Sequence, residues 1–146
     1  MADRHGPYRN ARFLLEIGGI VKAGFVRCKL PDSRTEPITY REGTDPPTPR
    51  KLWSITRYGD LVLESGVTDG TMELFEWREL VERGDVDEAR RDIGLVLLDE
   101  EGEQGSRWEF HRCWPRRYAP GPLDAEDDQV AIERLEICVQ RMERVA

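Results

Sequence analysis

The sequence predicts a mainly β fold of antiparallel strands with one α-helix. Apolar and polar residues alternate in several short segments, which is the pattern of half-buried strands. Gly-Gly or Asp-Gly pairs end some of these segments, where a tight turn needs residues that tolerate positive φ. Residues 71–83 instead repeat their apolar side chains at helical spacing.

Residues 12–30 predict a β-hairpin. Its first strand alternates up to Ile17, Gly18-Gly19 supplies the turn, and the second strand begins at Ile20. The alternation slips at Ala23-Gly24, which indicates a β-bulge. Two further strands are expected, at residues 38–41 and 60–67.

Residues 42–58 predict a long ordered loop. Prolines cluster between residues 46 and 49, and proline resists both helix and central strand. The segment also carries large apolar side chains, which a disordered linker rarely contains. They are Leu52, Trp53, Ile55 and Tyr58. These side chains either bury against a partner or fold back onto the core of the same chain, and the sequence leaves both readings open.

The second half of the chain predicts the helix and then more strands. Leu74, Trp77 and Val81 share one face of the helix, and Gly84 follows as its C-terminal cap. The segments after it are a charged connector at 85–92, a strand at 93–98, an acidic turn at 99–103, a strand at 106–114 and a loop at 116–128. Residues 129–143 fit both a helix and a strand, and their intrinsic propensity favours the helix.

Length and charge restrict the function classes. A chain of 146 residues is expected to form one domain. The net charge is −7, which disfavours general binding to a phosphate backbone. Residues 1–60 hold 11 Lys/Arg and 7 Asp/Glu, a net charge of +4, and the rest of the chain is acidic. The two halves either pair between copies or form ordinary solvated surface. Neither a secretory signal nor a membrane anchor is expected.

No segment predicts catalysis, a cofactor or a metal. The chain lacks the common nucleophile, dinucleotide, phosphate-loop and zinc motifs. His111 and Cys113 share a strand face, which offers no cleft for a nucleophilic pair. The cysteines, Cys28, Cys113 and Cys138, are odd in number and far apart, so we expect free thiols and not a disulfide or zinc site.

Four tryptophans are many for a chain with so little apolar content. Tryptophan is favoured in cores and as an interface anchor. Trp77 and Trp108 are expected in the core. Trp53, in the proline-rich segment, is the best candidate for an interface.

Several short segments, taken in order along the chain, are typical of one protein family. They are Phe13–Ile20 leading to Ala23–Phe25, Tyr40–Gly43, Arg50–Leu52, Arg57–Leu61, Trp77-Arg78, Arg90–Ile93, Leu97–Glu100, Trp114-Pro115 and Val130–Ile137. Together, from about residue 8 to residue 143, they resemble the tail-tube proteins of contractile phages and of phage-tail-like contractile injection systems.

The resemblance implies a β-sandwich or barrel subunit with one flanking helix. Six subunits would close into a ring, join strands into a shared barrel and stack into a tube inside a contractile sheath. Baseplate or tube-initiator proteins would be further partners, and the lumen would conduct a cargo effector or DNA. The tube would assemble in the cytoplasm and become part of a virion or injection particle. The resemblance also makes the closing segment a strand.

We expect residues 1–8 to be a flexible arm and residues 42–58 to carry the ring-to-ring contact. The stacking candidates are Arg50, Lys51, Leu52, Trp53, Arg57 and Tyr58. Opposing charges would come from residues 99–103 or 124–128. The lumen candidates are Lys22, Arg27, Lys29 and Arg41. The alternative function is a monomeric β-barrel that binds a small ligand among its aromatic side chains.

Overall fold

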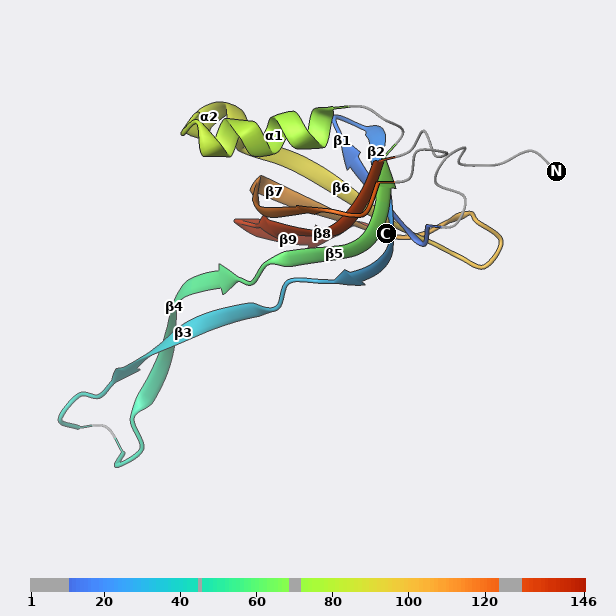
Figure 1. Ribbon diagram of the computed structural model, residues 1–146. Helices are drawn as coiled ribbons and strands as arrows, with labels where there is room; N and C mark the ends of the chain where they lie inside the picture. The colour runs from blue at the N-terminus through green and yellow to red at the C-terminus, as the bar shows by residue number, and fades with distance from the viewer. Residues whose placement is uncertain (1–10, 45, 69–71, 124–129) are drawn as a thin grey trace.

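The computed structural model describes residues 11–44, 46–68, 72–123 and 130–146, and it is mostly antiparallel β-sheet (Figure 1). The expected N-terminal arm at residues 1–8 lies outside the described residues. The elements are β1 (Phe13–Ile17), β2 (Ile20–Lys29), β3 (Ser33–Tyr40), β4 (Arg50–Tyr58), β5 (Leu61–Thr68), α1 (Glu73–Glu82), α2 (Val86–Ala89), β6 (Arg91–Leu98), β7 (Gln104–Pro120), β8 (Val130–Cys138) and β9 (Arg141–Arg144).

Six strands form a closed antiparallel barrel in the order β6-β1-β2-β5-β8-β7, because β6 also pairs with β7. The long β7 pairs with β6 and β9 through its first half and with β8 through its second half. Closure leaves the barrel strands without a free edge. The open edges of the described sheets therefore belong to β9 and to a separate two-stranded sheet, β3-β4.

The barrel interior is a packed core. Its largest fully buried side chains include Phe25, Phe110 and Leu15, which meet inside the closed sheet. A barrel of so few strands is filled by its own side chains, so the interior leaves no room for a ligand. The packed interior disfavours the expected alternative of a small-ligand-binding barrel.

The helices cover one side of this barrel (Figure 1). Leu74, Trp77 and Leu80 of α1 are buried in the same core cluster as the barrel residues. The indole nitrogen of Trp77 donates to the carbonyl of Ala89 at 2.5 Å, which ties α2 to α1. The expected core position of Trp77 is confirmed, and Trp108 is partly buried against the same cluster.

A second apolar cluster lies on the outer side of β1 and β6. Leu14, Val96 and Leu98 are buried there, apart from the main core. The strand at 93–98 is therefore apolar on both faces because both faces are buried within one chain.

The first hairpin matches the prediction. Gly18 and Gly19 have positive φ at the turn. Glu16 of β1 pairs with Val21, and the preceding residue, Leu15, pairs with Ala23. Lys22 is therefore the extra residue of a β-bulge.

One expectation is wrong, and another is confirmed. Residues 50–58 form strand β4, and only the first part of the expected loop at 42–58 connects strands. The strand that the resemblance implies for the closing segment is confirmed: β8 and β9 form there, against the helix propensity of the segment, because Ile132, Leu135 and Ile137 complete the barrel core. In addition, β7 continues to Pro120, into the expected loop at 116–128, and α2 forms within the expected connector.

Candidate assembly surfaces

The β3–β4 hairpin, residues 33–58, projects away from the barrel (Figure 1). Every residue of β3 is exposed, and so is every residue of β4 except Tyr58. A two-stranded hairpin without a covered face is marginally stable in water. This segment therefore has the character of a surface that is covered in an assembly.

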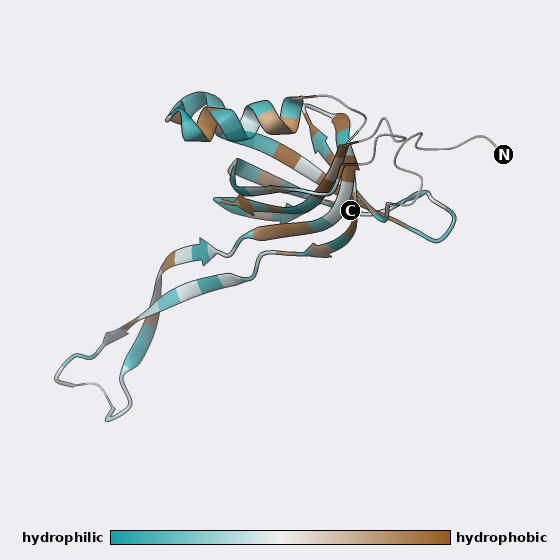
Figure 2. Ribbon diagram, in the orientation of Figure 1, coloured by the Kyte–Doolittle hydropathy of each residue, from teal (hydrophilic) through white to brown (hydrophobic). Residues whose placement is uncertain are grey.

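Apolar side chains lie on both faces of the hairpin. Ile38 pairs with Leu52, and Tyr40 lies two residues from Ile38 on the same face. Pro37 pairs with Trp53 on the opposite face, where the Trp53 residue is 82% exposed. Figure 2 shows hydrophobic segments among the polar ones along this hairpin. The reading in which Trp53 folds back onto its own core is therefore wrong for the single chain.

Side-chain hydrogen bonds order the hairpin. The hydroxyls of Thr35 and Thr56 are 3.0 Å apart across the strands, and the Ser54 hydroxyl donates to the Glu36 carbonyl at 3.1 Å. At the tip, the Arg41 guanidinium donates to the carbonyl of Pro46 at 3.2 Å. These contacts restrict the hairpin before binding, which lowers the entropy cost of docking it.

The stacking candidates do not all share one environment. Arg50, Lys51, Leu52 and Trp53 are consecutive and exposed in β4. Tyr58, in contrast, lies at the base of the hairpin and packs partly against the barrel core. Tyr58 therefore anchors the hairpin, while the first four residues form its exposed part.

The lumen candidates do not form one surface. The Lys22 ammonium forms an ion pair with Glu73 of α1 at 2.6 Å, on the helix-covered side. Arg27 instead contacts β5, where its guanidinium donates to the Ser65 hydroxyl at 3.1 Å. Arg41 belongs to the tip of the hairpin. The four residues therefore differ in their contacts within the single chain, and their place in a lumen stays a prediction.

An ion-pair network, which sequence reasoning missed, crosses the outer face of β2, β5, β8 and β7. The Glu64 carboxylate lies 3.9 Å from the Arg27 guanidinium and 3.2 Å from that of Arg134. Arg134 and Arg117 then bind Glu136, at 2.8 Å and 3.1 Å. Arg134 and Glu136, two residues apart on one strand, were a signal of this network in the sequence.

Glu136 is the centre of the network. Hydrogen bonds from Arg134 and then Arg117 hold the pKa of Glu136 below its ordinary value, against the opposing effect of burial. Arg116 adds a contact at 3.7 Å and joins Glu136 to Asp60. The face is therefore rich in charge, and its cations and carboxylates are paired with each other.

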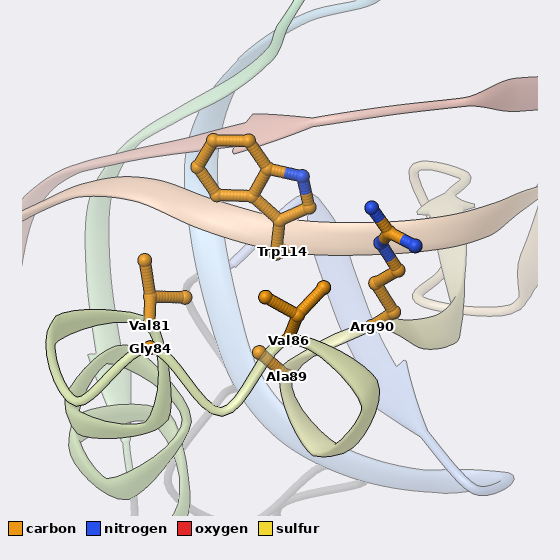
Figure 3. Close-up of a pocket in the computed structure, with 6 residues that line it drawn as sticks. All are labelled: Val81, Gly84, Val86, Ala89, Arg90 and Trp114. Atoms are coloured by element: carbon orange, nitrogen blue, oxygen red, sulfur yellow. The ribbon is translucent and has the colours of Figure 1, made fainter.

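The helices carry an acidic surface around an apolar pocket. Residues 73–89 contain seven carboxylates and two arginines, a net charge of −5. The pocket, about 210 Å³, is lined by Val81, Gly84, Val86, Ala89, Arg90 and Trp114. Figure 3 shows Val81 and Val86 pointing from the helices toward the Trp114 ring. We call this feature the helical pocket.

His111 and Cys113 do not form a reactive pair. Burial raises the pKa of the Cys113 thiol to about 12, so the thiolate does not form near neutral pH. The His111 ring lies outside the core, between Glu143 at 2.6 Å and Asp92 at 3.4 Å. Burial lowers the pKa of His111, but hydrogen bonds to Glu143 and Asp92 outweigh burial and raise it.

The described residues contain neither a metal-binding cluster nor a membrane-spanning helix. Within them, no three His, Cys, Asp or Glu side chains are grouped to hold a metal ion. None of the helices in this part of the chain has the length and apolar character needed to cross a membrane.

Comparison with known proteins gives a family and a set of solved structures. Residues 9–143 match the family described as T4-like virus tail tube protein gp19. A chain in the anti-feeding prophage (AFP) baseplate is 26% identical over 93% of both chains, with a TM-score of 0.63. No curated protein matches this sequence.

Two other solved structures show the fold alone. A chain of the sheath-tube complex of an extracellular contractile injection system, PVC, is 21% identical, with a TM-score of 0.63, over 92% of this chain and 89% of its own. Hcp1 from Flavobacterium johnsoniae is 16% identical, with a TM-score of 0.55, over 90% of this chain and 93% of its own.

Proposed function

The chain belongs to the T4-like virus tail tube protein gp19 family, and from this membership we infer that it is a structural inner-tube subunit of a contractile tail or injection system. The family and the structural neighbours are tube proteins, so the function is mechanical. The observation that carries this conclusion is the family match over residues 9–143.

In our proposal, six copies form a ring and rings stack into a hollow tube. The exposed β3–β4 hairpin supports it, because that hairpin has two open edges and uncovered apolar side chains. Neighbouring copies would cover both. The stacking residues are Arg50, Lys51, Leu52 and Trp53, with Arg57 nearer the barrel and Tyr58 as the internal anchor.

A head-to-tail stack also agrees with the shape of the subunit. The β6–β7 turn, gold in Figure 1, extends from the barrel on the side opposite the β3–β4 hairpin. A hairpin that leaves one end of each subunit can reach the next ring along the axis. Such a heterologous contact repeats from copy to copy.

The network face of β2, β5, β8 and β7 is our candidate for the lumen wall, with Arg27 and Lys29 at its β2 side. Exposed, alternating charges are suited to a wall along which cargo slides without adhering. A cargo effector or DNA would pass along it. A contractile sheath would surround the tube, and baseplate or tube-initiator proteins would begin it, after assembly in the cytoplasm.

Electron microscopy together with size-exclusion chromatography tests this function. The full-length protein at high concentration and near-physiological salt is expected to give sixfold rings and tubes. A strictly monomeric species of about 17 kDa under those conditions would contradict the proposal.

A further inference from the structure

The helical pocket is apolar and is already formed in the single chain. Val81, Val86 and Ala89 line it from the two helices, and Trp114 closes it from β7. The hydrogen bond from Trp77 to Ala89 holds α2 in place beside α1. The walls therefore do not depend on a ligand for their positions.

The helices that carry the helical pocket are acidic, while Arg90 lines the pocket itself. Glu76, Asp87 and Glu88 are exposed on the two helices. Val86, which lines the pocket, is 52% exposed despite its apolar side chain. Residues 73–91, which include Arg90 and Arg91, carry a net charge of −3, so an apolar opening on this acidic segment favours a partner that combines a large apolar side chain with cations.

Strand β4 has this combination. Its Trp53 is 82% exposed, and the strand carries Arg50, Lys51 and Arg57 but no carboxylate. An indole ring supplies a large apolar area that gains energy when it is desolvated in a pocket. Arg90 at the pocket wall can also contact the face of an aromatic ring through a cation–π interaction.

The two surfaces cannot meet within one chain. Figure 1 shows the helices on one side of the barrel and the β3–β4 hairpin leaving it on the other. The β3–β4 hairpin and the helical pocket are different patches of the same chain, so a contact between them is heterologous and repeats from copy to copy.

The acidic β6–β7 turn is a less suitable docking site for Trp53 than the helical pocket. Residues 99–103 contain no large apolar side chain. The Asp99 carboxylate already accepts the backbone N–H groups of Glu101 and Glu103, at 3.0 Å and 2.8 Å. The turn offers charge but no large apolar side chain against which an indole could pack.

We propose that Trp53 of one copy inserts into the helical pocket of a second copy, with β4 cations facing the acidic helices. This contact rests on the proposed tube function, since it specifies the surface on which the hairpin docks.

Photo-cross-linking tests the contact directly. The full chain carries benzoylphenylalanine in place of Trp53, which keeps a large aromatic group at this position. After irradiation of assembled protein and trypsin digestion, adducts are expected on the peptide 84–90, which contains Val86, or on 113–116, which contains Trp114. Adducts confined to the peptide 92–107 would assign the contact to the acidic turn and overturn the proposal.

A substitution that fills the helical pocket gives a second, independent test of the contact. Val86→Trp fills the pocket and is expected to raise the protein concentration needed for assembly by about tenfold or more, as Trp53→Ala does. The double variant should lose little more than either single variant, because both remove the same contact. Leu123→Trp adds an indole at another exposed site and is the matched control.

The outcomes separate the two proposals. Tubes from the wild-type protein and undiminished assembly of Val86→Trp, with an unchanged subunit melting temperature, would overturn the pocket contact alone. Failure of the wild-type protein to form rings or tubes would overturn the tube function and the contact together.

Discussion

At the scale of single residues, several positions are set by contacts that the chain makes with itself. Gly66 lies opposite Phe25 in the β2–β5 ladder. A Cβ atom at this position would lie 2.3 Å from two carbons of the Phe25 ring. The ring fills the space that any side chain on this residue would need.

Gly66→Ala should therefore destabilise the subunit by about 1–3 kcal/mol, the usual cost of overpacking. Denaturant unfolding of the monomer, or of the lowest oligomer, measures the change. Gly43→Ala is the control, because a Cβ there meets no atom within 4 Å. Equal stability of the two variants would contradict this account of Gly66.

His111 links three strands through charge. On β7, it lies between Asp92 of β6 and Glu143 of β9. Arg141 of β9 contacts Glu143 at 3.7 Å, and the Arg112 backbone N–H donates to Asp92 at 2.9 Å. The charged imidazolium is favoured in the folded state, so its pKa is raised above 6.5.

A raised pKa sets the sign of the pH dependence. The stabilisation is fully present below about pH 6.5, above the range in which Asp92 titrates, and is lost as pH rises through the folded-state pKa. Urea unfolding of the wild type and of His111→Gln should differ more at pH 6 than at pH 9. A stability difference that is the same at both values would exclude this ionic role.

At the scale of elements, the network across β2, β5, β8 and β7 is centred on one carboxylate. The Glu136 side chain is 10% exposed and contacts Arg134, Arg117 and Arg116. Removing its charge leaves these guanidinium groups without their shared partner.

Glu136→Gln is expected to lower the free energy of unfolding by about 1–3 kcal/mol at pH 7. Because the pKa of Glu136 is depressed, the loss should shrink as pH falls below about 4.5 and through the folded-state value. Glu133→Gln, at an exposed position of the same strand, is the control. Identical unfolding curves for the two variants would count against the network.

The β3–β4 hairpin is the element with the least self-burial. Trp53→Ala should leave the melting temperature of the subunit nearly unchanged, since exposed substitutions alter stability by about 0.5 kcal/mol or less. It should weaken stacking by about 2 kcal/mol or more per contact. Long tubes together with a sharply lowered melting temperature would show that Trp53 serves the subunit core instead.

At the scale of the whole molecule, charge is divided between residues 1–60, which include the hairpin, and the rest of the chain. Residues 1–60 carry a net charge of +4 within a protein of net charge −7. Opposite patches on two copies steer their encounter and fix their register, and this effect is screened by salt.

The double variant Arg50→Glu, Lys51→Glu should slow assembly because it reverses the attractive part of this encounter. Light scattering over a range of salt concentrations measures the rate. Wild-type assembly should slow as salt is added, whereas added salt should partly restore the variant. Equal rates at low salt would contradict an electrostatic role for β4.

The fold class and part of the element order followed from local patterns. The first hairpin was predictable because its strands bury one face, which produces the alternation, and because Gly18-Gly19 suits the turn. Helix α1 was predictable for the same reason, because Leu74 and Trp77 are apolar at helical spacing and both lie on its buried side. The exposed basic residues of β4 were likewise identified, as the candidates from Arg50 to Trp53.

What the sequence by itself determined about this protein is its mainly β class, its one long helix, its tail-tube resemblance and the surplus of apolar residues around Trp53. The tertiary structure decided that residues 50–58 are a strand and that Glu136 gathers three arginines, and it confirmed the closing strands that the resemblance implied against helix propensity. The physical reason is that periodicity reports burial of one face, and β4 has no buried face. In β8, the strand pairing that closes the barrel stabilises the segment more than its helix propensity favours a helix. The ion-pair network and the helical pocket each join segments that are far apart in the sequence.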